Sequence, residues 1–221
     1  MADWRWDDAA GRYRDLVTGR FISHDYVLSL IGQSMAATAN VTDALGSFVS
    51  TGAINTADWQ SAFFQEIKAE YIRQYLAGIG GRNMMTPADW GSIGGMLKEQ
   101  LNYLKGFANE IAAGNLTEGH IRSRMAMYIN SAREAYERAR GRVVGKLGTM
   151  DEVHWNLDGP IEHCDDCVSR ENMGWQPIGP TGGFPTIDGE SFPGMGDTQC
   201  LTNCACSLSY QNSATGEEWE G

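Results

Sequence analysis

The sequence predicts a mainly α-helical protein with a small, loop-rich C-terminal module that contains short β-strands and is stapled by zinc. Apolar residues recur at helical spacing through residues 23–149, whereas all five cysteines lie beyond that stretch. Residues 1–149 hold 16 basic and 15 acidic residues, a net of +1, and residues 150–221 hold one basic and 13 acidic residues, a net of −12. These changes predict four segments: an N-terminal arm (1–22), an α-helical domain (23–149), a cysteine-rich zinc module (150–210) and an acidic tail (211–221).

Length and composition exclude several classes of protein. The chain has 221 residues, of which 42% are hydrophobic and 10% aromatic, so it can bury a core and is not wholly disordered. No run of 18 apolar residues occurs, and the N-terminus lacks the apolar stretch of a signal peptide, so we expect neither a spanning helix nor secretion. A net charge of −11 disfavours specific binding to nucleic acid and polybasic binding to membranes.

The N-terminal arm is rich in aromatic side chains. Trp4, Trp6, Tyr13 and Phe21 lie within its 22 residues, around a turn at Thr18-Gly19. So many aromatics are unusual for a solvated tail. The arm is therefore expected either to fold back onto the helices or to dock on another subunit.

Four helices are expected in the α-helical domain. They run through residues 22–50, from Thr56 to about Gly78, from Thr86 to about Gly114, and from Thr117 to about Lys146. The threonines are suitable N-caps, and Pro87 suits the first helical position. Weak helix formers at residues 38–42 predict a bend or break in the first helix.

The fourth expected helix carries seven of the 17 basic residues on the face opposite its apolar stripe: Arg122, Arg124, Arg133, Arg138, Arg140, Arg142 and Lys146. One interpretation is a solvated face with pairs four residues apart, such as Glu134 with Arg138. The other is a docking face for an acidic partner or for the acidic C-terminal part of the same chain.

The cysteines have the spacing of a structural zinc site. Cys164 and Cys167 form a Cys-x₂-Cys pair, and Cys200, Cys204 and Cys206 follow after 32 intervening residues. Zinc prefers four ligands in a tetrahedron, and such short spacings let one turn supply two of them. We expect one zinc ion per chain on Cys164, Cys167, Cys200 and Cys204. Cys206 can replace either of the last two, His163 also competes, and two disulfides with one free thiol are the alternative.

The composition of the intervening loop explains why metal is needed. Residues 174–196 contain seven glycines and four prolines but few large apolar side chains. Such a stretch buries too little area to offset the entropy of ordering it. A metal ion that closes the loop supplies the missing stability, because its binding free energy becomes folding free energy.

Catalysis at this site is not expected. A catalytic zinc keeps an open position beside a general base, for which Glu162, His154 and His163 are the neighbouring candidates. No zinc-hydrolase, deaminase or phosphate-loop pattern accompanies them. We expect His154 to pack beside Trp155, and His163 to support the first ligand turn through its ring N–H.

The C-terminal motifs resemble those of tailed-bacteriophage minor head proteins, the head-morphogenesis family. The motifs are VHWNLD at 153–158, EHCDDC at 162–167, FPG at 192–194 and TQCLTNCACSL at 198–208. A less specific likeness to phage morphogenesis proteins is the segment YRDLVTGRF at 13–21. One departure is Ala205, which stands where the family often has an arginine, so this chain lacks that basic residue.

The resemblance implies a structural virion protein and not an enzyme. Its partners would be the portal or the major capsid protein, with a scaffolding protein as a further candidate and weak DNA contact through the arginines of the fourth helix. Its place would be the capsid interior or the head–tail connector, and the host cytoplasm during assembly. The alternatives are a zinc-dependent hydrolase or nuclease of a mobile element and a cellular zinc-ribbon adaptor.

Overall fold

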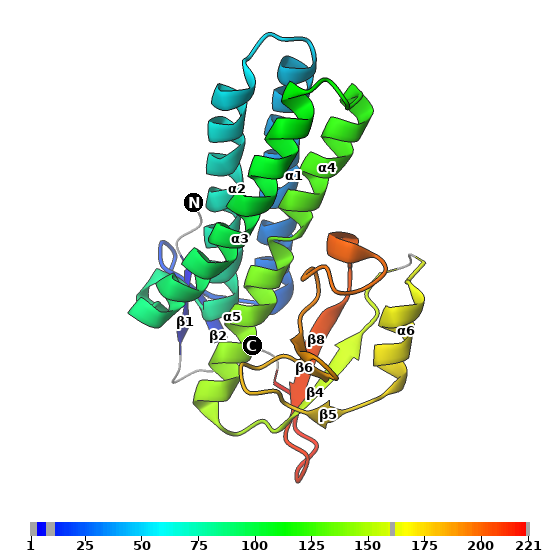
Figure 1. Ribbon diagram of the computed structural model, residues 1–221. Helices are drawn as coiled ribbons and strands as arrows, with labels where there is room; N and C mark the ends of the chain where they lie inside the picture. Colours follow the sequence, from blue (N-terminus) through cyan, green and yellow to red (C-terminus); the bar gives the residue numbers. More distant parts are fainter. Residues whose placement is uncertain (1–3, 8–11, 160–161, 220–221) are drawn as a thin grey trace.

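Five helices form an elongated body, and a small lobe of short strands packs against one end of it (Figure 1). This computed structural model describes residues 4–7, 12–159 and 162–219. The body helices are α1 (His24–Ser50), α2 (Thr56–Ile79), α3 (Pro87–Ala112), α4 (Glu118–Asn130) and α5 (Arg133–Leu147), with a 3₁₀ turn at Arg82–Met84. The predicted class, mainly helical with short strands, is confirmed. Within the described residues, none of the helices has the length and apolar character that crossing a bilayer requires.

Side-chain caps explain where the body helices begin. Ser23, Asn55, Thr86 and Thr117 each accept a hydrogen bond from the backbone amide three residues later. Thr86 forms a full capping box with Asp89, behind a proline at the first helical position. The prediction for α2 was wrong by one residue, because Asn55 and not Thr56 is its cap.

The first helix is continuous where we expect a bend. Thr38 and Thr42 are buried, so these weak helix formers face a neighbouring helix. The Thr38 hydroxyl donates to the Glu70 carboxylate of α2 at 2.9 Å, and Thr42 donates to the carbonyl of Ala39 at 3.0 Å. Tertiary contacts thus compensate for the low helix propensity of this stretch.

The fourth expected helix is two helices, and this prediction was wrong. Ser131 and Ala132 separate α4 from α5. The Ser131 hydroxyl donates to the Tyr128 carbonyl at 2.8 Å and hydrogen-bonds the Tyr71 hydroxyl of α2 at 2.9 Å. The amides of Ala132 and Ala135 then bond the carbonyls three residues earlier, which tightens the chain into a turn.

The body is held by one large apolar core, in which α2 and α5 lie closest together. Buried aromatic rings from α2, α3 and α4 fill it, with Trp59, Phe63, Phe107 and Tyr128 in edge or stacked contact. The small residue Gly78 permits the close approach of α2 to α5, since a Cβ there would overlap the carbonyl of Tyr136 on α5.

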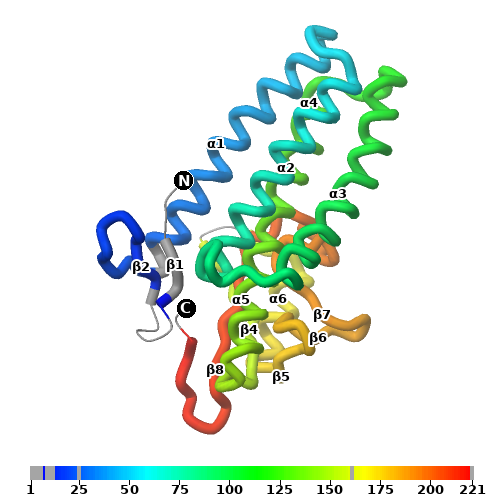
Figure 2. Tube along the Cα trace, turned by 90° about the vertical axis from the view of Figure 1, so that its left-hand side faces the viewer, coloured from blue at the N-terminus to red at the C-terminus, as the bar shows by residue number. Residues whose placement is uncertain are grey.

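The N-terminal arm folds back onto the helices. It forms an antiparallel sheet of β1 (Trp4–Asp7), β2 (Arg12–Asp15) and β3 (Phe21–Ile22), which lies beside the start of α1 (Figure 2). Tyr13 is buried against Ala77 and Tyr136, as the first of the two alternatives predicts. The side chains of Trp4 and Trp6 lie outside what the structure describes.

The C-terminal lobe is built on a three-stranded antiparallel sheet in the order β5–β4–β8. Its elements are β4 (Glu152–Asn156), α6 (Asp165–Asn172), β5 (Gln176–Pro177), the hairpin β6 (Phe184–Thr186) and β7 (Gly189–Ser191), a 3₁₀ turn at Leu201–Asn203, and β8 (Ser207–Gln211). Burial alternates along β4 and β8, which directs Trp155 and its partner Leu208 into the lobe's core.

Helix α5 contributes side chains to the core of the body and to the core of the lobe. Val143 packs in the body's core, whereas its neighbour Val144 packs in the core of the lobe. Figure 2 shows α5 between the body helices and strands β4 and β8. The backbones meet at Gly141 and Gly182: a Cβ added to Gly141 would lie 2.8 Å from the Gly182 carbonyl oxygen.

Three of the seven predicted basic residues hold the lobe in place. The buried Arg140 donates to the Leu208 carbonyl at 2.8 Å and pairs with buried Glu137 at 3.4 Å. Arg133 pairs with Asp158, and the Arg138 guanidinium lies 4.5 Å from the ring centre of Phe192. These three residues thus contact the C-terminal part, as the docking interpretation predicts. The pair between Glu134 and Arg138 that the other interpretation predicts also forms, at 2.5 Å.

The other four predicted basic residues pair with acids of the helical body. Arg122 pairs with Asp43, and Arg124 with Glu110 at 2.6 Å. Arg142 and Lys146 both reach the buried carboxylate of Asp89, at 2.7 and 4.0 Å.

The described end of the predicted acidic tail, residues 211–219, is folded and not extended. The Trp219 amide donates to the Tyr210 carbonyl at 2.9 Å, and Gln211 forms a bridge with Glu218. The Trp219 ring packs against Tyr210 and lies 5.1 Å from the Arg140 guanidinium. Trp219 thus packs where the lobe meets helix α5, and this contact holds the acidic segment in a folded conformation.

Candidate metal centre

Two short turns present the cysteines. Cys164 occupies the N-cap position of helix α6 and Cys167 lies in its first turn, so both side chains share one face. Cys200 and Cys204 flank the 3₁₀ turn at Leu201–Asn203, where Leu201 has an unusual φ of 52°. Each ligand pair predicted from the sequence thus spans a single turn.

Hydrogen bonds tie the two turns together. The Asp166 carboxylate of α6 accepts from the Gln199 amide at 2.8 Å. Within the second segment, the Thr198 hydroxyl lies 3.2 Å from Cys200 Sγ. Arg170, the lobe's one base, pairs with Asp197 at 3.1 Å and stacks over Trp155. Sequence reasoning missed the roles of Asp166 and Thr198; the only available signal was their position beside the cysteines.

All five cysteines converge, and none is in a disulfide. Two groups of sulfur atoms, each within 4.8 Å of one another, could hold a metal ion: Cys164, Cys167 and Cys200, and Cys167, Cys204 and Cys206. Cys167 belongs to both, with its Sγ 3.7 Å from that of Cys200 and 3.6 Å from that of Cys204. Thiolates gathered in this way are typical ligands for zinc and other thiophilic metals.

The close spacing of the thiols shifts their pKa values and favours a bound cation. Burial and the neighbouring Cys204 raise the pKa of the Cys167 thiol. A hydrogen bond from the Cys206 side chain lowers the pKa of Cys204 to about 5. Thiolates this close together repel one another, so several can ionise together only when a metal ion offsets their charge.

The histidines do not lie as we expect. His163 does not support the first ligand turn: its Nδ1 lies 3.6 Å from Cys206 Sγ, on the other cysteine segment. His154 packs not beside Trp155 but against Trp175, with ring centres 5.2 Å apart, and its Nδ1 contacts Asn156 at 2.8 Å. Adjacent side chains on β4 point to opposite faces of the sheet, which separates His154 from Trp155.

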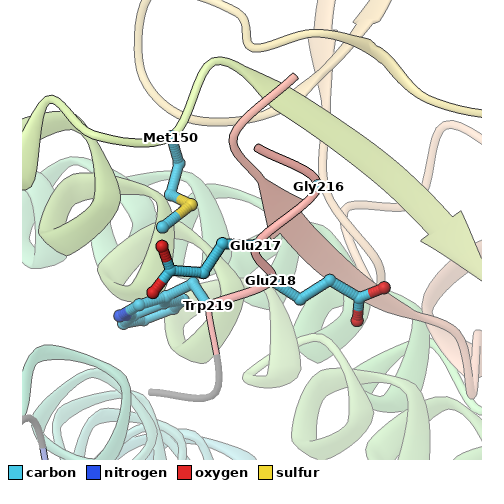
Figure 3. A pocket seen from close by; sticks show the side chains of 5 residues that line it. All are labelled: Met150, Gly216, Glu217, Glu218 and Trp219. Carbon is cyan, nitrogen blue, oxygen red and sulfur yellow. The ribbon is translucent and has the colours of Figure 1, made fainter. Parts of the chain in front are cut away.

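Of the three candidate bases, His163 alone stands beside the cysteines in the part of the chain that the structure describes. Glu162 is exposed, and neither it nor His154 belongs to either group of potential metal ligands. A separate surface pocket lies between the start of β4 and the returning C-terminal segment (Figure 3). Its lining is Met150, Gly216, Glu217, Glu218 and Trp219, which contains no nucleophile and no base other than carboxylates.

Comparison with known proteins identifies no relative. No family model, no curated protein and no solved structure matches the chain. The interpretation of the site therefore depends on the geometry of the cysteines and on the motifs around them.

Proposed function

We propose that the cysteine cluster binds structural zinc and that the chain is a minor head protein of a tailed bacteriophage, with no catalytic role. The observation that carries the proposal is the convergence of five cysteines, three of them buried, from two distant segments at one place in the lobe. The head-protein role rests on the motif likeness around these cysteines.

A structural role fits the way the lobe is built. Cysteine sulfurs form part of its core, beside Trp155, Phe184 and Phe192. A metal ion there closes the long loop between Cys167 and Cys200. With at least four protein donors at hand, the ion needs no water ligand, which is the arrangement of structural zinc.

The charge distribution favours protein partners. Within the described residues the exposed acids of the lobe include Glu162, Asp165 and Asp188, a surface that repels DNA. The arginines of α4 and α5 are engaged with carboxylates and with the lobe, which leaves little free positive charge for phosphate groups. The portal and the major capsid protein remain the proposed partners, in the capsid interior or at the connector.

Metal analysis tests the first half of the proposal. Full-length chain purified without chelator is expected to contain zinc, and Cys167→Ser to lose it. Val168→Ser, an exposed neighbour in the same turn of α6, is the matched control and should retain the metal. A metal-free wild-type chain with an intact lobe would contradict the proposal.

Localisation tests the second half. Mass spectrometry of purified proheads and mature virions, from the phage or prophage that encodes the chain, should detect it in one or both particles at low copy number. Absence from both particles would exclude the head-protein role and leave the metal site unaffected.

A further inference from the structure

The cysteine cluster holds more donors than one zinc ion uses. A tetrahedral ion takes four ligands, whereas five thiols and the His163 ring meet here. If the four ligands predicted from spacing hold one ion, Cys206 and His163 remain, 3.6 Å apart. Cys206 is fully buried and within 4.8 Å of Cys167 and Cys204. A single ion would leave this second group of donors unused.

Cys206 and His163, together with Cys167 and Cys204, supply enough donors for a second metal site. The sulfurs of Cys167, Cys204 and Cys206 lie within 4.8 Å of one another, and His163 Nδ1 lies 3.6 Å from Cys206 Sγ. The buried Nε2 of His163 has no hydrogen-bond partner among residues 162–219 or elsewhere in the described chain. This leaves Nε2 free to carry the proton while Nδ1 offers its lone pair to a metal ion.

We propose that the lobe binds two metal ions that share Cys167 and Cys204 as bridging thiolates. Cys164 and Cys200 complete the first position, and Cys206 and His163 complete the second. The inference rests on the proposed metal-binding role and extends it. Six donors fill the eight coordination positions of two tetrahedral ions only when two donors are shared.

The sulfur distances fit this arrangement. With a zinc–sulfur bond of about 2.3 Å, two sulfurs of one tetrahedron lie about 3.8 Å apart. Cys167 Sγ lies 3.6 Å from Cys204 Sγ and 3.7 Å from Cys200 Sγ. Cys204 belongs to the second group of sulfurs and lies next to Cys167, the cysteine that the two groups share.

Each of the two cysteine segments supplies donors to both positions. His163 and Cys164 are adjacent in the first segment, and Cys204 and Cys206 lie two residues apart in the second. Two dications on five thiolates leave a net charge of about −1, so the buried cluster is nearly neutral.

The test is metal stoichiometry in the full-length chain. Zinc analysis after gel filtration should give two ions per chain, and His163→Ala should reduce this to one. His154→Ala, which changes a histidine outside the cluster, is the matched control and should keep two. Titration with Co²⁺ should raise the thiolate-to-cobalt absorption up to two equivalents in the wild type and up to one in His163→Ala.

Each outcome decides one point. One ion in both the wild type and His163→Ala overturns the second position but keeps the proposed zinc lobe, whereas no ion in a folded wild type overturns both. Two ions in His163→Ala overturn the assignment of that ligand. If near-ultraviolet circular dichroism shows that His163→Ala has lost its fold, Cys206→Ser tests the same position, with one ion expected and two ions overturning it.

Discussion

The helical body and the C-terminal lobe are stabilised in different ways. The core of the body is formed by 21 buried residues that include Trp59, Phe63, Tyr71 and Phe107, and helix caps define its elements. The lobe's core has ten buried residues, three of which are cysteines. The body buries a large apolar core, whereas the small core of the lobe includes sulfur atoms that could hold a metal ion. Under the proposed function, metal binding supplies the folding free energy that apolar burial in the lobe does not.

Removal of one ligand should separate the two regions most clearly. We expect Cys167→Ser to unfold the lobe while far-ultraviolet circular dichroism retains most of the helical signal, because structural zinc supplies about 10–16 kcal/mol of binding free energy to small domains. Near-ultraviolet dichroism reports the lobe through Trp155. Val168→Ser should behave as wild type. Loss of the whole helical signal would show that the regions fold as one unit.

Substitution of Arg140 should be the next largest effect, since this side chain joins the regions. Arg140→Ala leaves Glu137 buried without its partner and removes the bond to the Leu208 carbonyl. Loss of one member of a buried ion pair costs about 3–5 kcal/mol of unfolding free energy. Chemical denaturation measures it. The double variant Glu137→Leu, Arg140→Met should recover part of the loss, and an equal loss in both variants would exclude the ion pair as its cause.

Gly141→Ala should perturb the contact between the regions by a smaller amount. The added Cβ would meet the Gly182 backbone at 2.8–3.0 Å, and overpacking of this kind costs about 1–3 kcal/mol. Gly145→Ala on the same helix meets no atom within 4 Å and should stabilise by up to about 1 kcal/mol. Thermal melts of the two variants are expected to shift in opposite directions; a parallel shift would argue against the close contact.

Substitution of Asp89 by Asn should have the smallest effect on the unfolding free energy, and this effect should arise in the helical body. Burial opposes the ionisation of Asp89, but hydrogen bonds from Thr86 and Tyr75 and the charge of Arg142 hold its pKa below the ordinary value. Its contribution is therefore complete above the unfolded pKa of about 3.9 and is lost as the pH falls through the lower folded pKa. The difference in unfolding free energy between wild type and Asp89→Asn should shrink in that acidic window. A difference independent of pH would contradict this account.

Helix caps and cysteine spacings in the sequence predict local structure well. The sequence does not predict the break between α4 and α5 or the contact between the body and the lobe. Thr86, Pro87 and the cysteine spacings act within one turn, and the structure places helices and ligand turns there. The break at Ser131 arises from a bond to Tyr71 on another helix, and the burial of Arg140 arises from strand β8. Both depend on partners 60 or more residues away, which no periodicity in the chain reveals.

The close approach of Gly141 and Gly182 also constrains how the sequence can evolve. A side chain at either position collides with the backbone of the other, and Gly182 has a φ of 95° that other residues rarely adopt. Neither position can drift alone, even though one lies in the helical half and the other in the glycine-rich loop. An exchange of the cysteine module between related chains would therefore succeed only when the recipient helix also carries the matching glycine.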